Sequence, residues 1–230
     1  MFDRLADRYD LLNRLMSLGV DKRWRKRTVR ELCLSPTAKV LDLATGTADL
    51  AIDIASRHPQ VHVVGVDPSV KMLERGRTKV TKAKLDERVR LVEGIGEDLP
   101  FADGEFDAVT IAFGIRNCTD RAQALREMKR VTRPGGRVAI LELGEPTGGI
   151  MAPVARFHIH QIIPRLGAWI SGAREYRYLQ ESIEAFPPSS EFAALMDSCG
   201  LRMLELVRFS FGSCHLYLAE VPVDEERLAN

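Results

Sequence analysis

Two aspartates that follow consecutive apolar runs have the types and spacing to bind a ligand. Residues 40–50 read as an apolar strand that enters a turn of small residues and then a helix, and Asp42 is predicted to lie inside this turn. Asp67 ends the next apolar run, 61–66. Small residues such as Gly46 let the backbone approach a ligand, and a carboxylate one strand–helix unit later can hold ribose hydroxyls. The spacing therefore indicates a nucleoside-cofactor site.

Two kinds of nucleoside compete for such a site. A dinucleotide site uses three glycines in the turn and places the pyrophosphate on the helix N-terminus. This turn offers one glycine, Gly46, and Asp42 would repel a pyrophosphate. S-adenosyl-L-methionine carries a sulfonium cation and an ammonium group and no phosphate, so that Asp42 attracts it. The electrostatics favour the methyl donor over NAD.

The rest of the chain is expected to position this site in one doubly wound α/β domain over residues 1–230. Apolar and amphipathic runs alternate from 38 to 143, which predicts a mostly parallel sheet with helices on both faces. The expected strands are 38–43, 61–66, 88–93, 106–112 and 137–143, and the expected helices are 48–57, 69–82 and 120–132. The segment Arg133-Pro134-Gly135-Gly136 is predicted to be a turn before the fifth strand.

Segments on both sides of this donor-binding core complete the predicted domain. An N-terminal helical cap is expected over 1–34, with its second helix near 22–32. A helical insert, 144–200, with helices near 150–170, 174–184 and 189–199, is expected on the acceptor side. Two final strands, 202–209 and 212–221, form a C-terminal antiparallel hairpin (201–221), which gives a seven-stranded sheet in all.

The four cysteines form no C-x-x-C pair, which indicates reduced thiols in a cytoplasmic protein. Hydrophobic residues make up 45% and charged residues 28% of the chain, and 33 basic residues nearly balance 32 acidic ones, so nucleic acid is not an expected partner. The basic stretch 22–30 is either a solvated helix face or a contact with an anionic ligand or membrane. The cysteines have no metal-ligand spacing, and no third ligand accompanies His158 and His160, so no metal is expected.

Further motifs resemble one family of methyltransferases. The motifs are Tyr9-Asp10 with Asn13, Ser17-Leu18-Gly19, Trp24-Arg25, Leu99-Pro100-Phe101, Phe113-Gly114-Ile115-Arg116-Asn117, Arg133-Pro134-Gly135-Gly136 and Glu175-Tyr176-Arg177-Tyr178-Leu179 with Ser182-Ile183. Together with the two aspartates, they resemble the ubiquinone/menaquinone biosynthesis C-methyltransferases from about residue 2 to 218. The Leu-Pro-Phe and Pro-Gly-Gly motifs are shared by many methyltransferases, whereas the first motif and the segment 113–117 are much more specific.

The resemblance implies a donor site, with three departures from the family pattern. Thr47 and Asp67 match family contacts to S-adenosyl-L-methionine. Ala48 stands in place of the usual third small residue, glycine. Ile95-Gly96 stands where the family usually has Asn or Asp followed by Ala against the adenine, and Ala112 replaces a usual serine. Each departure is expected to cost about 1 kcal/mol of donor affinity if it removes one hydrogen bond.

The resemblance also implies the chemistry and the acceptor-side residues. A quinol ring carbon beside a hydroxyl becomes nucleophilic when that hydroxyl loses its proton. Arg116 stays protonated at neutral pH, so it is expected to stabilise the phenolate or to orient a water that accepts the proton. Asn117 is expected to hold the second quinol oxygen, and Tyr9 to close over the donor or acceptor. Without the resemblance, Arg116 would be interpreted as part of a surface ion pair with a neighbour such as Asp120.

The expected activity is C-methylation of a polyprenylated quinol, demethylmenaquinol to menaquinol, in respiratory quinone biosynthesis. The apolar stretch 150–172 is a buried helix, a prenyl-chain tunnel or a membrane-surface helix, and the sequence leaves all three open. A peripheral membrane contact at the inner face and a homodimer are the other expected associations. Two alternatives stay open: a class I methyltransferase acting on another small molecule, and a binding protein with a decayed donor site.

Overall fold

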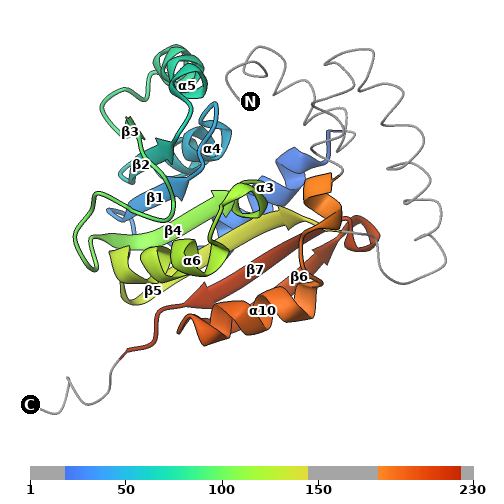
Figure 1. Cartoon of the computed structure of the whole chain (residues 1–230). Helices are drawn as coiled ribbons and strands as arrows, with labels where there is room; N and C mark the ends of the chain where they lie inside the picture. Colours follow the sequence, from blue (N-terminus) through green and yellow to red (C-terminus); the bar gives the residue numbers. More distant parts are fainter. Residues whose placement is uncertain (1–18, 145–180, 224–230) are drawn as a thin grey trace, which may run out of the picture.

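The computed structural model describes residues 19–144 and 181–223, and in these residues helices cover both faces of one seven-stranded sheet (Figure 1). The strands are β1 (Lys39–Leu43), β2 (His62–Asp67), β3 (Val89–Glu93), β4 (Phe106–Ala112), β5 (Thr132–Leu143), β6 (Arg202–Phe209) and β7 (Cys214–Glu220). Their order across the sheet is β3-β2-β1-β4-β5-β7-β6. The predicted fold class is confirmed, because β1 to β5 are parallel and the C-terminal hairpin is antiparallel.

Two groups of helices cover the two faces of the sheet. The helices are α3 (Asp21–Glu31), α4 (Asp49–Arg57), α5 (Val70–Lys82), α6 (Arg121–Val131) and α10 (Ser189–Ser198). Buried side chains of α3, α4 and α5 join one hydrophobic cluster, and those of α6 and α10 join the other. In Figure 1, α6 and α10 lie in front of the sheet and α3 lies behind it.

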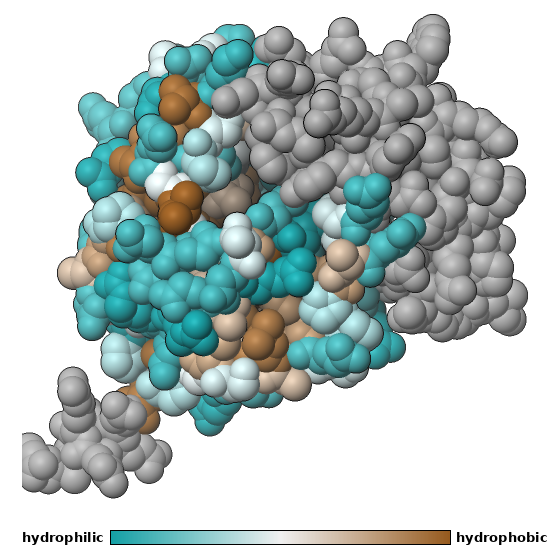
Figure 2. Space-filling view, viewed as in Figure 1, coloured by the Kyte–Doolittle hydropathy of each residue, from teal (hydrophilic) through white to brown (hydrophobic). Residues whose placement is uncertain are grey.

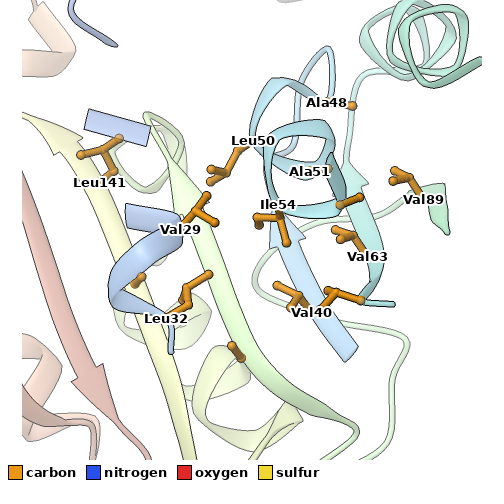
Figure 3. Packing of buried hydrophobic residues seen from close by; sticks show 14 of the residues in the cluster. Val29, Leu32, Val40, Ala48, Leu50, Ala51, Ile54, Val63, Val89 and Leu141 are labelled. Carbon is orange, nitrogen blue, oxygen red and sulfur yellow. The ribbon is translucent and has the colours of Figure 1, made fainter. Parts of the chain in front are cut away.

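Strands buried on both faces explain why the sequence shows continuous apolar runs instead of alternation. In β1, Val40 belongs to one cluster while Leu41 and Leu43 belong to the other. Figure 3 shows the first cluster, in which α4 side chains such as Ile54 lie near Val63 of β2. Burial on both sides fixes the positions of the strand ends, and these ends carry the predicted site residues.

The prediction of a turn at 133–136 is wrong, because these residues belong to β5. Thr132 already pairs with Phe106 of β4, and the register then shifts before Ala108 pairs with Arg137. Gly135 has a φ of 73° inside this irregularity. A Cβ at Gly136 would lie 2.7 Å from the carbonyl oxygen of Asp107, so the two backbones approach closely there. The Pro-Gly-Gly sequence therefore produces a bulge within the strand.

Within the described residues, the other predicted strands and helices are confirmed. Most of their ends lie within one or two residues of the predicted positions. The predicted hairpin is also confirmed, and the short 3₁₀ segment Ser210–Gly212 joins its strands. The expected helix 150–170, most of 174–184, and the first part of the N-terminal cap lie outside the described residues. The boundaries proposed for the cap and the insert stay predictions.

Candidate functional site

The carboxylate of Asp67, the last residue of β2, organises the turn that follows β1. Its Oδ2 accepts a hydrogen bond from the backbone N–H of Gly46 at 2.8 Å, and its Oδ1 accepts one from the N–H of Ser69 at 2.9 Å. Gly46 has a φ of 56°, in the left-handed region that favours glycine. A carboxylate has about four lone-pair sites. The two bonds fix the Asp67 carboxylate at the edge of the sheet, where carboxylate oxygens can accept hydrogen bonds from hydroxyl groups of a ligand.

Asp42 lies within β1, and its predicted place inside the turn is a wrong prediction. The side chain is 1% exposed, and its oxygens accept hydrogen bonds from the hydroxyls of Thr45 (2.6 Å) and Thr110 (2.9 Å). Burial raises the pKa of Asp42 to about 6, although both hydroxyls and the positive charge of Arg25 oppose the shift. The acid therefore lies directly beneath the turn, where it favours a cationic ligand.

Three non-glycine residues with positive φ surround this turn. They are Ala44 (50°), Ala48 (65°) and Phe113 (60°). Ala44 follows β1 and Phe113 follows β4, and a Cβ at Gly114 would lie 2.5 Å from the Cβ of Ala44. The loops after β1 and β4 therefore pack against each other at the point where the strand order reverses. Such backbone strain concentrates at functional sites, and ligands bind at this edge of open α/β sheets.

The small residues at the start of α4 pack against α5. Ala48 is fully buried, and its methyl group would lie 3.3 Å from a Cβ at Gly76 of α5. The methyl that departs from the family pattern therefore points into helix packing. The hydroxyl of the neighbouring Thr47 accepts a hydrogen bond from Nζ of Lys79 at 2.9 Å, and Lys79 also pairs with Asp49. Helix α5, which carries Lys79, therefore holds Thr47 in place.

Apolar side chains flank Asp67 on the side of β3. Asp67 pairs with Glu93 in the sheet, so Ile95 follows the strand end beside it, and Val70 begins α5 three residues after Asp67. Ile95 is 50% and Val70 45% exposed. Figure 2 shows hydrophobic atoms among hydrophilic ones over the part of the molecule where β2, β3 and α5 lie. Gly96 is buried, and a Cβ there would lie 3.1 Å from Leu43, so the backbone at 96 lies close to the end of β1.

Arg116 forms a buried ion pair after β4. It lies in the 3₁₀ segment Ile115–Asn117, and its guanidinium contacts the carboxylate of Glu142, which is fully buried in β5. The guanidinium also donates to the carbonyl oxygen of Phe113 at 2.8 Å, while its Nε has no hydrogen-bond partner in the described part of the chain. The alternative interpretation is correct that Arg116 forms an ion pair, but the pair is buried and its partner is Glu142, whereas Asp120 caps α6 by accepting from the N–H of Gln123.

The remaining predicted residues lie near this pair or outside the described residues. Ala112, which ends β4, is half-buried and pairs with Leu141 of β5. Asn117 is half-buried and ends the same 3₁₀ segment as Arg116. Tyr9 lies outside the described residues. The structure thus brings the predicted residues between 42 and 117 to one edge of the sheet.

Comparison with known proteins adds the family to this geometry. Residues 1–220 match the model of the ubiE/COQ5 methyltransferase family. The chain belongs to this family. A ubiquinone/menaquinone biosynthesis C-methyltransferase UbiE of Syntrophotalea carbinolica is 45% identical over 94% of this chain and 91% of its own length. A demethylmenaquinone methyltransferase of Thermus thermophilus is 46% identical over 94% of this chain and 98% of its own length.

Solved structures support the fold of the family member. A methyltransferase in complex with the Haloferax volcanii activator Trm112 has a TM-score of 0.70 at 17% identity and covers 97% of this chain and 98% of its own. A SAM-dependent methyltransferase of Aquifex aeolicus has a TM-score of 0.64 at 18% identity, over 86% of this chain and 89% of its own. The resemblance and the enzyme class predicted from the sequence are confirmed by the family match.

Two side chains beside this edge were missed by the sequence analysis, and a third was noted only as part of a motif. Glu142 is an acid within the apolar run of β5, a pattern that could have indicated a buried ion pair. His215 lies opposite it on β7. The guanidinium of Arg25, noted within the Trp24-Arg25 motif, lies 5.4 Å from the ring centroid of Phe113, so part of the basic stretch faces the site. No group of three metal-ligating side chains occurs among the described residues.

Proposed function

We propose that this methyltransferase transfers a methyl group from S-adenosyl-L-methionine to a ring carbon of a polyprenylated quinol, with demethylmenaquinol as acceptor and menaquinol as product. The observation that carries the proposal is the position of the Asp67 carboxylate, which bonds the turn at Gly46 at the edge of the sheet where the strand order reverses between β1 and β4. Family membership supports a quinol acceptor, because its named relatives are methyltransferases of quinone biosynthesis.

The described residues fit each chemical part of the donor. Asp67 would accept hydrogen bonds from the ribose hydroxyls. The exposed apolar side chains of Val70 and Ile95 on either side of it offer faces for the adenine ring. Asp42 would attract the positively charged end of the donor. Arg25, which interacts electrostatically with Asp42, would attract the carboxylate of the donor's amino-acid part.

The protein contributes binding, orientation and exclusion of water. When bound, S-adenosyl-L-methionine supplies an electrophilic methyl group on a sulfonium. Arg116 would stabilise negative charge on the acceptor oxygen, because its Nε–H is buried and keeps a free donor position within the described residues. Asn117 would hold the second quinol oxygen from the same 3₁₀ segment, and Tyr9 would close over the bound molecules. Holding the reactants in line accounts for much of the acceleration in such reactions.

Donor affinity is expected to rise with pH through the titration of Asp42. Its pKa of about 6 in the free protein means that a proton must leave before the carboxylate can attract the cationic donor. A cation stabilises the ionised form, so binding releases a proton below pH 6 and the dissociation constant falls about tenfold between pH 5 and pH 7, then levels off. Titration calorimetry at several pH values checks this. In Asp42→Asn, the dissociation constant should be weak and independent of pH; an unchanged pH dependence would assign it to another group.

Incubation with defined acceptors tests the proposed activity. Anaerobic reaction of the purified protein with methyl-labelled donor and demethylmenaquinol is expected to yield labelled menaquinol, identified by mass spectrometry. The matching demethylated benzoquinol, carrying the same prenyl chain, tests the choice of nucleus. Donor binding without label transfer to any quinol would favour a different small-molecule acceptor. Absence of donor binding would favour a binding protein with a decayed site.

The same proposal includes reversible contact with a membrane surface, where a prenylated acceptor resides. Helix α3 exposes the basic side chains of Lys22, Arg23 and Lys26, which suit an anionic lipid surface. Among the described residues, no helix has the length and hydrophobicity to cross a membrane. The stretch 150–172 lies outside these residues, and its three interpretations, like the expected homodimer, stay predictions.

A further inference from the structure

One buried ring nitrogen close to the Arg116–Glu142 pair is without a hydrogen-bond partner. Five buried side-chain atoms of the described residues share this property, and they belong to Arg25, Arg27, Arg116, Arg121 and His215. Four of them are Nε atoms of arginine, which can only donate. The fifth, Nε2 of His215, can accept a proton when the neutral imidazole carries its hydrogen on Nδ1. A buried polar group left unpaired in this way calls for a functional explanation.

The sheet places His215 directly beside the buried ion pair. His215 of β7 lies opposite Glu142 of β5 and opposite Arg208 of β6. Its side chain is buried, with 4% of the residue exposed. A Cβ at Gly144 would lie 2.9 Å from Nδ1 of the imidazole, so glycine at this position leaves the space that the ring occupies. The ring therefore lies at the carboxyl end of β5, the edge at which β4 presents Arg116.

Glu142 itself is not available to take up a proton from a ligand. One of its oxygens contacts the Arg116 guanidinium and accepts from the N–H of Leu143 at 2.8 Å, and the other accepts from the N–H of Arg116 at 3.3 Å. Nε2 of His215 is thus available to take up a proton, whereas the neighbouring carboxylate of Glu142 is not. At this edge, Arg116 offers a buried N–H donor and His215 a buried nitrogen acceptor, both unpaired within the described chain.

We propose that His215 is a catalytic residue that accepts the proton of the acceptor's phenolic hydroxyl, beside the Arg116–Glu142 pair. This inference rests on the proposed function. The O–H bond breaks, its proton moves to Nε2, and the electron pair stays on oxygen, where the Nε–H of Arg116 stabilises it. The adjacent ring carbon then forms the bond to the donor methyl, whose former bonding pair leaves with sulfur. The proton on that ring carbon goes to solvent, the aromatic ring is restored, and His215 returns its proton to the oxygen.

The surroundings keep the imidazole in the form that can accept a proton. Burial lowers the pKa of His215 below its ordinary value, and the positive charge of Arg208 lowers it further. Among the residues that the structure describes, the other charged or titratable groups that face it are Glu142, which is paired with Arg116, and Tyr217, whose ring centroid lies 6.0 Å away. Burial raises the pKa of Tyr217, so this phenol stays neutral as well. The lowered pKa therefore favours the neutral imidazole, the form that can accept a proton.

The decisive experiment compares His215→Gln with wild type in single-turnover methyl transfer to demethylmenaquinol, anaerobically, from pH 6 to pH 9. Glutamine is close in size but cannot take up the proton. The methyl-transfer rate of His215→Gln is expected to be about 10²-fold lower than that of wild type at pH 7. This difference should shrink as the pH rises, because more quinol then ionises without a base. Donor affinity from calorimetry should stay at the wild-type value. The control variant His62→Gln carries the same change at the exposed first residue of β2, at the other edge of the sheet. Its methyl-transfer rate should equal that of wild type.

Chemical rescue separates proton transfer from a structural role. His215→Ala creates space for a small base, so added imidazole is expected to restore part of its rate in proportion to the neutral imidazole concentration. A His215→Gln rate within twofold of wild type at every pH would overturn the inference. The inference would also be overturned if His215→Gln lost the same factor in rate at every pH and imidazole restored no activity to His215→Ala. If wild type itself transfers no methyl group to the quinol, the proposed function fails, and that result is distinct from either of the other two.

Discussion

Arg116→Ala is expected to lower the free energy of unfolding by about 3–5 kcal/mol, because it leaves the carboxylate of Glu142 charged and unpaired in the core. Glu142 is fully buried and Arg116 is 8% exposed, so little water can replace the lost guanidinium. Urea unfolding at neutral pH measures the change. The matched control is Arg133→Ala, whose ion pair with Asp107 is partly exposed and should contribute no more than about 1 kcal/mol.

The double variant Arg116→Ala/Glu142→Gln should recover most of the lost stability, since it removes the unpaired charge as well as its partner. Equal unfolding free energies for wild type and Arg116→Ala would contradict a stabilising role of the ion pair. Arg116→Lys keeps a counter-charge, so it should be more stable than Arg116→Ala. Lysine lacks the planar two-donor fork, however, and its methyl-transfer rate should be well below that of wild type if Arg116 also stabilises the phenolate.

Asp67→Asn is expected to weaken binding of S-adenosyl-L-methionine by about 10- to 100-fold, or about 1.5–3 kcal/mol. The substitution removes the charge that would strengthen the bonds to the ribose. It also replaces one carboxylate oxygen by an NH2 group, which cannot accept the hydrogen bond that this oxygen takes from the N–H of Gly46 or of Ser69. Calorimetry at pH 7 measures the affinity. Asp103→Ala, the loss of an exposed acid from a surface pair with Arg130, should leave it unchanged.

Thermal unfolding of the donor-free variant must accompany this measurement. The structure shows that Asp67 holds two backbone N–H groups, so a moderate loss of stability is expected together with the loss of affinity. Added donor should stabilise wild type more than Asp67→Asn, because stabilisation by a ligand depends on its affinity. Wild-type affinity in Asp67→Asn would place the ribose elsewhere.

The three departures from the family pattern have different consequences in the structure. Ala48 costs backbone strain at φ 65°, but its methyl group is buried against α5 and does not face a ligand. Ile95 is exposed beside Asp67, where its side chain offers an apolar surface although it cannot accept a hydrogen bond. Ala112 ends β4 and loses only a hydroxyl. A usable donor site is therefore consistent with all three residues, which weakens the case for a decayed site.

The sequence by itself determined the parallel core and the strand ends that carry the site. Hydrophobic runs and turn residues are local signals, and the order of strands and helices follows from them, so these signals alone place Asp67 and Gly46 at one edge of the sheet. It also indicated the family, because the motif around 113–117 is specific. The Pro-Gly-Gly segment misled the prediction, since a bulge and a turn use the same residues.

Only the tertiary structure decided which polar groups meet across strands. Arg116 and Glu142 are 26 residues apart, and His215 joins them through the antiparallel pairing of β7 with β5. Neither partner of such a contact carries a local signal for the other. The burial of Asp42, which raises its pKa, likewise depends on α4 and on Thr110 of β4 covering it from outside β1. Local patterns fix where the chain forms strands, whereas charge pairing and desolvation depend on neighbours that are distant in sequence.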